Sequence, residues 1–188
     1  MMISYAVYGA IAAVLLVFVG IYNSLVTRRN QVENVAGSID AYLKKRYDLI
    51  PKLVDTAKVF MEHERGTLEG VVSLRNSGLA PGAGLDQRLE ADREITRILS
   101  GLRVSFEQYP QLKSDSHFLQ LQSALSEVEE QLSAARRAYN AAVTDYNNGV
   151  EMIPHLFVAR LAGMSRKETL RTPEAELRDP NVRELFRR

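Results

Sequence analysis

Residues 118–146 read FLQLQSALSEVEEQLSAARRAYNAAVTDY, and their apolar side chains recur at alternating steps of three and four residues. The positions that carry this repeat are Phe118, Leu121, Leu125, Val128, Leu132, Ala135, Tyr139, Ala142 and Tyr146. A repeat of this kind, kept over four heptads, is the seam of a helix in a bundle or coiled coil. Ser114 or Asp115 can cap the start of this helix, and Gly149 can stop its end.

Shorter stripes of the same kind precede this stretch. They consist of Val32, Ala36, Ile39 and Leu43; Ile50, Leu53, Ala57 and Phe60; Leu68, Val71, Val72 and Leu74; and Leu85, Leu89, Ile95, Leu99, Leu102, Phe106 and Tyr109. Gly78 and Pro110 end two of the stripes, and the glycine-rich residues 78–84 form a flexible connection. No stretch shows sustained period-two alternation, so the chain beyond residue 27 is predicted to be all-α.

Residues 44–54, KKRYDLIPKLV, place a proline between two apolar stripes and admit two interpretations. Asp48 can cap a new helix that begins at Leu49, which would put Pro51 in the first turn, where its missing N–H was unpaired anyway. Alternatively, the apolar stripe stays in phase across the proline, as in one long, kinked helix. We favour a tight turn at residues 47–48.

The predicted architecture is an antiparallel four-helix bundle of long, coiled-coil-like helices over residues 28–150. Its last helix would return the chain to the end where the first helix began. Residues 151–188 follow, with an apolar, cation-edged segment at 153–164 and a charged tail over the last twenty or so residues. The segment 153–164 fits two roles, an amphipathic contact with lipid headgroups or a lid on the end of the bundle.

Residues 1–27 form the predicted transmembrane anchor, because they carry no charged side chain and residues 11–21, IAAVLLVFVGI, are almost purely apolar. Roughly 20 apolar residues at about 1.5 Å each cross a ~30 Å hydrocarbon core. No basic residue precedes the apolar run, which favours an anchor over a cleaved signal peptide. Arg28 and Arg29 follow it, so the positive-inside rule predicts a single-pass protein of the cell (inner) membrane, with a short outside N-terminus and a cytoplasmic C-terminal domain.

Composition and motifs argue against several classes of function. The 188-residue chain has a formal net charge of +1 and no cysteine, which excludes thiolate metal sites and does not suggest a polyanion-binding surface. His63-Glu64 lacks the second histidine of a zincin helix, because Thr67 stands in its place. Residues 78–84 lack the Gly-Lys-Ser/Thr ending of a phosphate-binding loop. We therefore predict no catalytic residue, cofactor, metal site, small-molecule substrate or nucleic-acid partner, and expect that the chain is not an enzyme.

Ten residues are candidates for a partner or lipid interface. They are Lys44, Lys45, Arg46, Tyr139, Asn140, Tyr146, Asn147, Leu156, Phe157 and Leu161. The first three form the densest basic cluster, which fits a partner-facing patch or a solvated turn. The next four are Tyr-Asn pairs one heptad apart, which place amide groups on one side of a helix for hydrogen bonds between helices or subunits. The last three are apolar residues of the segment 153–164.

Several short stretches together resemble the LemA family of bacterial membrane-anchored helical proteins. They are Tyr22-Asn23, Arg29-Asn30, Val32-Glu33, Ile39-Asp40, Leu43-Lys44, Arg46-Tyr47-Asp48-Leu49-Ile50-Pro51, Leu53-Val54, His63-Glu64, Phe118-Leu119-x-Leu121-Gln122 and Arg136-x-x-Tyr139-Asn140-x-x-Val143-x-x-Tyr146-Asn147. The resemblance runs from residue 22 to about 164 and implies one transmembrane helix, a short outside N-terminus and a four-helix bundle. It implies no catalytic function. Relatives are linked to membrane-stress proteases or to organelle membrane formation, which implies partners rather than chemistry.

Two functional hypotheses follow. The first is a non-enzymatic, single-pass membrane protein that acts as a helical scaffold or adaptor, either as a homo-oligomer or by binding another membrane protein. The alternative is a lipid-binding or membrane-shaping module that inserts the segment 153–164 beside the anchor.

Overall fold

The computed structural model describes residues 2–170, and within that range it contains helices and loops but no strand. The helices are α1 (Met2–Lys58), α2 (Arg65–Gly78), α3 (Leu85–Ser105), α4 (Pro110–Ser114), α5 (Ser116–Glu151) and α6 (His155–Leu161), with 3-10 turns η1 (Glu62–Glu64) and η2 (Phe106–Gln108). The all-α prediction is confirmed. Beyond Leu170, the predicted charged tail lies outside the described residues.

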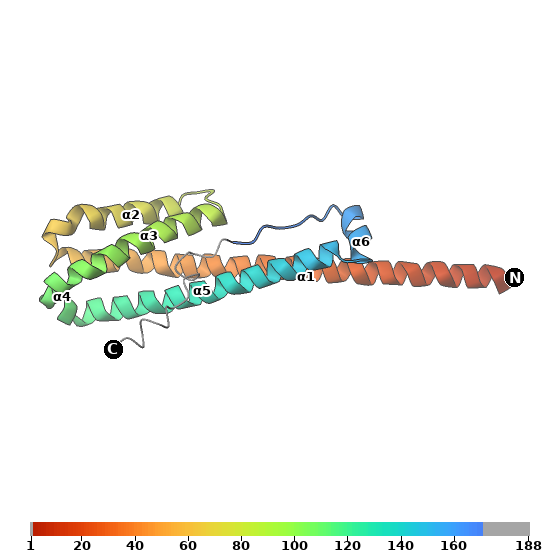
Figure 1. Cartoon of the computed structure of the whole chain (residues 1–188), viewed down its shortest axis with the longest axis horizontal. Helices are drawn as coiled ribbons and strands as arrows, with labels where there is room; N and C mark the ends of the chain where they lie inside the picture. The colour runs from red at the N-terminus through yellow and green to blue at the C-terminus, as the bar shows by residue number, and fades with distance from the viewer. Residues whose placement is uncertain (1, 171–188) are drawn as a thin grey trace, which may run out of the picture.

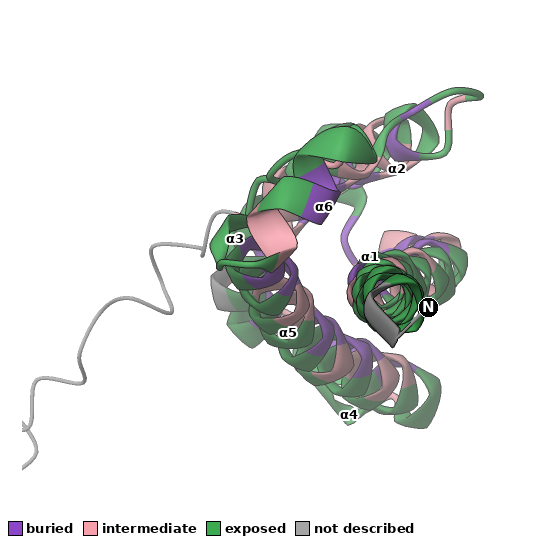
Figure 2. Cartoon of the chain, turned by 90° about the vertical axis from the view of Figure 1, so that its right-hand side faces the viewer, coloured by how far each residue is buried: buried purple, intermediate pink, exposed green. Residues whose placement is uncertain are grey.

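Helix α1 runs from one end of the molecule to the other (Figure 1). Helix α5 returns along it and makes the most extensive helix–helix contact. The hairpin formed by α2 and α3 lies along the half of α1 that is far from the N-terminus (Figure 1). A view along the molecule places α1 on the concave side of an arc of α2, α3 and α5 (Figure 2).

The molecule contains two apolar cores, which follow one another along its length. The distal core joins α1, α2, α3 and α5, and its large buried members include Ile39, Leu43, Ile50, Leu53, Leu68, Leu89, Ile95, Leu102, Phe118 and Leu132. The proximal core lies nearer the N-terminus, between α1, α5 and α6, and consists of Leu25, Val32, Val143, Tyr146, Val150, Val158 and Ala159. Of the nine seam positions predicted for residues 118–146, six are buried and three half-buried, so the heptad repeat is the packing face of α5.

The N-terminal part of α1 packs against nothing in the described chain. Residues 4–20 are exposed on every side. Among the described residues, α1 is the one helix long and apolar enough to cross a membrane, and none of its most apolar window is buried. An apolar helix in the interior of a soluble domain would instead be covered by other elements, so this exposure is typical of a membrane anchor.

The predicted turn at residues 47–48 is wrong, because α1 continues through Pro51 without a break. A proline inside a helix leaves the carbonyl four residues earlier without its usual N–H donor. That carbonyl belongs to Tyr47, and Nε of Arg75 on α2 donates to it at 3.1 Å. A side chain from a neighbouring helix thus offsets the lost hydrogen bond. The chain turns at residues 59–64 instead.

The end of α2 and the start of α5 follow the local signals in the sequence, whereas the predicted stop of α5 at Gly149 is wrong. Helix α2 ends at Gly78, and the glycine-rich connection leads to α3. The carboxylate of Asp115 caps α5 by accepting a hydrogen bond from the Phe118 N–H at 2.8 Å. Helix α5 continues past Gly149 and ends two residues later, at Glu151.

Gly78 allows α2 to approach α1 closely. A Cβ atom at Gly78 would lie 2.5 Å from Oη and 2.8 Å from Cζ of Tyr47. The ring cannot move aside freely, because Tyr47 is buried and its hydroxyl donates to the carbonyl oxygen of Arg88 at 2.9 Å. We therefore expect Gly78→Ala to lower the free energy of unfolding by about 1–3 kcal/mol, measured by urea unfolding of the full chain in detergent micelles.

Gly70 offers a matched control on the same helix. A Cβ atom there would meet nothing within 4 Å. Gly70→Ala should therefore raise the free energy of unfolding by about 0.5–1 kcal/mol, through helix propensity alone. Equal changes in the two variants would contradict the close contact between Gly78 and Tyr47.

Candidate functional site

The short helix α6 packs on α1 at the point where the exposed apolar run of α1 ends. Helix α6 packs Val158 and Ala159 into the proximal core, together with Leu25 of α1. Ile21 packs against the same core, and it directly follows the exposed residues 4–20. Helix α6 therefore lies beside the boundary between the exposed apolar run of α1 and the packed part of the molecule (Figure 1).

The outer side of this region is apolar and exposed. Phe157 and Leu161 of α6 are 60% and 79% exposed, and Met152 and Ile153 just before α6 are exposed as well. We call these four residues the apolar collar. Of the three interface residues predicted in this segment, two belong to the collar, whereas Leu156 is half-buried. Large exposed apolar side chains grouped in this way are typical of a contact with a protein or a membrane.

Asn140 and Asn147 hold the segment 165–170 along α5. Oδ1 of Asn140 accepts the N–H of Leu170 at 2.8 Å, and its Nδ2 donates to the Leu170 carbonyl at 3.0 Å. Asn147 makes the same pair of hydrogen bonds with the backbone of Lys167, both at 2.9 Å. We call these two side chains the asparagine clamp. The predicted bonds between helices or subunits are thus made to the chain's own C-terminal segment.

The spacing of the clamp explains why both amides can be used at once. Seven residues of α-helix rise about 10.5 Å, and three residues of extended chain span about 10 Å. Two amides one heptad apart therefore meet peptide groups three residues apart. Each side-chain amide offers both donors and an acceptor, which match the C=O and N–H of one backbone residue. The clamp consequently binds the extended backbone rather than particular side chains.

The segment also contacts α1 through a lysine. Nζ of Lys167 lies 3.6 Å from Oε1 of Glu33 and 5.8 Å from the ring centroid of Tyr146. A hydrogen bond from Arg29 and the charge of Lys167 lower the pKa of Glu33. Burial raises the pKa of Tyr146 and of Tyr139.

The basic cluster Lys44, Lys45 and Arg46 is not one surface patch. Lys44 and Lys45 are exposed, and Nζ of Lys45 lies 3.5 Å from Oε1 of Glu127 on α5. Arg46 is only 3% exposed and points into the molecule. It therefore cannot belong to a partner-facing patch, and the reason is the continuity of α1, which keeps residue 46 on the same face as the apolar stripe.

Arg46 belongs to a buried ion network that joins three helices. Its Nη1 lies 2.9 Å from Oδ1 of Asp92 on α3, and Nη2 of Arg136 on α5 lies 2.8 Å from the other oxygen of that carboxylate. Nη2 of Arg46 donates to Oγ1 of Thr96 at 2.9 Å. Burial and the nearby charge of Asp92 also raise the pKa of Tyr47 to about 12. One carboxylate thus compensates two guanidinium groups inside the molecule.

Sequence reasoning missed Asp92 and Arg136 as partners of Arg46. A signal was present, because Asp92 lies three residues after Leu89 and three before Ile95, on the apolar stripe of α3. A charged residue at a core position requires a partner of opposite charge. The sequence does not say from which helix that partner comes.

The sequence model of the LemA family matches residues 35–183 of the chain. The chain belongs to the LemA family. The match begins within α1, after the exposed apolar run, and includes the ion network, the asparagine clamp and α6. The resemblance found in the sequence is therefore confirmed.

Individual relatives agree with this LemA assignment. The chain is 27% identical over 169 residues to Protein LemA of Metamycoplasma hominis, a match that covers 90% of the chain and 77% of that protein. It is 24% identical to Magnetosome protein MamQ 2 of Paramagnetospirillum magneticum and 23% identical to Magnetosome protein MamQ of Magnetospirillum gryphiswaldense. Each of these matches covers 78% of the chain but only 63% of the relative, so the chain spans less than two thirds of the MamQ proteins.

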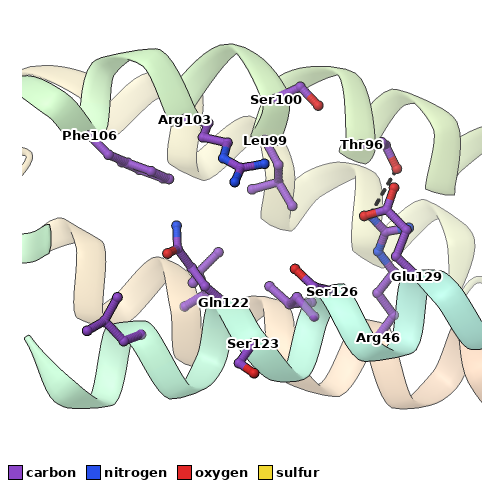
Figure 3. Close-up of a pocket in the computed structure, with 13 residues that line it drawn as sticks. Arg46, Thr96, Leu99, Ser100, Arg103, Phe106, Gln122, Ser123, Ser126 and Glu129 are labelled. Carbon is purple, nitrogen blue, oxygen red and sulfur yellow. Dashed lines mark hydrogen bonds and ion pairs between the residues drawn. The ribbon is translucent and has the colours of Figure 1, made fainter. Parts of the chain in front are cut away.

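A cavity of about 280 Å³ lies next to the ion network of this LemA-family chain, between α3 and α5 (Figure 3). Arg46 and Thr96 line one end of it, and Phe106 lies toward the other. Nothing in the sequence indicated this cavity, because its lining comes from three helices. Within residues 2–170, no group of three or more histidine, cysteine, aspartate or glutamate residues is placed to hold a metal ion.

Proposed function

We propose that this LemA-family chain is a non-enzymatic, membrane-tethered helical scaffold or adaptor. The observation that carries the proposal is the continuity of α1, which joins the exposed apolar run to the packed body in one helix. There is no flexible linker between the two parts, so the body is held at a defined position relative to the membrane. A rigid attachment suits a protein that presents surfaces to other membrane-bound molecules.

The body suits this role by its dimensions and its surface. The packed part of α1, from Leu25 to Lys58, is roughly 50 Å long at 1.5 Å per residue. With α2, α3 and α5 it makes the four-helix bundle that we propose as the structural unit. The outer face of α5 is polar and exposed, with Glu130 and Arg137 among its residues. Self-assembly or binding of another membrane protein would use these long exposed faces.

We place the N-terminus outside and the body in the cytoplasm, at the inner membrane. Arg28 and Arg29 follow the apolar run and supply the positive charge of the cytoplasmic side. Arg28 also supports the junction, because its Nη1 donates to the carbonyl oxygen of Asp145 on α5 at 3.0 Å. The names of the MamQ relatives associate those proteins with magnetosomes, which agrees with a role at a membrane.

The alternative function, contact with lipid, is favoured by the apolar collar. Its four side chains are exposed beside the end of the apolar run, at the level where the bilayer surface would lie. An exposed Arg160 stands in the last turn of α6 and can reach lipid phosphates while its stem stays apolar. The collar would then seat the scaffold on the membrane or, acting on its own, shape the bilayer.

A photocrosslinking scan tests both functions in native membranes. A benzophenone amino acid is placed singly at Lys44 and Glu130 on the body, at Phe157 and Leu161 in the collar, and at His63 at the far end as a control. The side chains at all five positions are exposed to solvent. We expect the body positions to give protein adducts and the collar positions to give phospholipid adducts, with no lipid adduct at His63.

Mass spectrometry of the adducts separates the outcomes. Body adducts with a second copy would support a self-assembling scaffold, and a recurrent adduct with one other membrane protein would support an adaptor. Lipid adducts in the collar without any protein adduct on the body would favour the alternative. The scaffold proposal fails if neither body position captures a protein, and the lipid contact fails if neither collar position captures phospholipid.

A further inference from the structure

We infer that the cavity between α3 and α5 binds a small carboxylate that carries an apolar chain. This inference does not depend on the scaffold proposal, because it concerns the far half of the molecule rather than the anchor or the collar. The site is assembled from α1, α3 and α5 at the level of the ion network (Figure 3).

The cavity has an apolar part and a polar part. Leu53, Leu99, Phe106, Leu119 and Leu125 supply the apolar lining. Its volume of about 280 Å³ lies just below the range of roughly 300–1,000 Å³ for ligand pockets, so it suits a small ligand. Five of the lining residues are apolar and eight are polar, so a matching ligand offers both an apolar part and hydrogen-bonding groups.

The polar lining of the cavity carries an excess of positive charge. Arg46 lies at the end with Thr96, whereas Arg103 lies nearer Phe106, and the guanidinium of Arg103 points into the space between the helices (Figure 3). Behind this lining, Asp92 lies 2.9 Å from Arg46 and 2.8 Å from Arg136, so one carboxylate faces two guanidinium groups. Glu129 is the one acidic residue of the lining, so the group of three arginines and two carboxylates has a net charge of +1.

Two observations favour an anion at the arginines. Nε of Arg46 has no hydrogen-bond partner in the described structure, and because it is buried a ligand reaches it only when the Arg46 side chain moves. A buried donor without a partner costs free energy, which a ligand oxygen would recover. Within residues 2–170, Arg103 has no carboxylate within ion-pair distance.

Glu129 indicates what kind of group fits this position. Its carboxylate reaches Nη2 of Arg46 at 3.9 Å, longer than a hydrogen bond, from a side chain that is 56% exposed. The contact is loose and reversible, so a free carboxylate can replace it. An arginine fork matches a carboxylate in geometry, and a single positive charge suits a monoanion better than a dianion. The apolar lining would hold the rest of such a ligand.

The test uses hexanoate and its uncharged analogue hexanamide as probes. The full chain is embedded in lipid nanodiscs with isotope-labelled leucine methyl groups, and binding is followed by NMR. We expect hexanoate to shift the methyl signals of Leu53, Leu99 and Leu125 and to bind at least tenfold more tightly than hexanamide. Equal binding of the two probes, or shifts confined to Leu156 and Leu161 of α6, would overturn the inference.

Three exposed variants separate ligand binding from an effect on folding. Arg103→Gln should weaken hexanoate binding about tenfold and leave hexanamide unchanged, whereas Glu129→Gln should strengthen hexanoate binding several-fold. Arg97→Gln is the matched control, because it lies on α3 in an exposed ion pair with Glu94 and outside the cavity. The inference fails if Arg103→Gln behaves like Arg97→Gln, or if Arg103→Gln and Glu129→Gln change the affinity in the same direction.

Discussion

Replacing Asp92 with asparagine should lower the free energy of unfolding by about 3–5 kcal/mol. The change removes the one carboxylate that compensates Arg46 and Arg136 inside the molecule. A buried charge that loses its partner keeps the cost of desolvation without the attraction that offset it. Arg46 is affected most, because it is 3% exposed and cannot turn to solvent. The change is measured by urea unfolding of the full chain in detergent micelles, followed by circular dichroism.

A control on the same helix isolates the effect of burial. Glu94→Gln removes the same charge from an exposed pair with Arg97, and should cost about 0–1 kcal/mol. A double variant, Arg46→Met with Asp92→Leu, should recover part of the lost stability, because it removes both charges of the most buried pair but leaves Arg136, whose side chain is 16% exposed, without Asp92. If Asp92→Asn costs no more than Glu94→Gln, the network does not hold the three helices together.

Replacing both clamp residues with alanine should release the segment 165–170 from α5. Asn140→Ala with Asn147→Ala removes four hydrogen bonds to the backbone of Lys167 and Leu170. At about 0.5–1.5 kcal/mol net for each bond, the segment should lose about 2–6 kcal/mol of local stability. Opening of the segment should then be at least about 30-fold more frequent. Trypsin cleavage after Arg166 and Lys167, followed by mass spectrometry, measures this change in the full chain.

Asn148 supplies the matched control for the clamp. It is the exposed neighbour of Asn147 on the same helix, and within residues 2–170 no hydrogen bond joins its side chain to the segment. Asn148→Ala should leave the rate of cleavage within about twofold of the unchanged chain. Cleavage that is equally fast in the clamp variant and in Asn148→Ala would show that the packing of Met164 and Leu170, rather than the clamp, holds the segment in place.

Local patterns in the sequence predicted the features that depend on residues close together in the chain. The apolar repeat of residues 118–146 identified the packing face of α5, and Asp115 identified its start, because both signals act within one or two turns of helix. The apolar run near the N-terminus identified the part of α1 that stays exposed. Family membership also followed from short motifs, as the match over residues 35–183 confirms.

The sequence identified several residues that make polar contacts, but it did not identify the groups that they contact. Asn140 and Asn147 stood out because amides one heptad apart face the same way, but their partners are backbone groups that any sequence would supply. Arg46 stood out as a basic residue, yet its role depends on Asp92, which is 46 positions away in the chain. No local pattern encodes such a pairing.

The sequence by itself determined that the chain is helical, which faces of the helices are apolar and where a membrane span can lie. Only the tertiary structure decided that α1 passes through Pro51, that Arg46 is buried and that the segment 165–170 follows α5. The physical reason is the same in all three cases. In each case a local feature costs free energy: the missing N–H of Pro51, the buried charge of Arg46 and the unpaired backbone of the segment 165–170. The groups that offset this cost come from another helix. They are Arg75 on α2, Asp92 on α3 and the clamp on α5, in the same order.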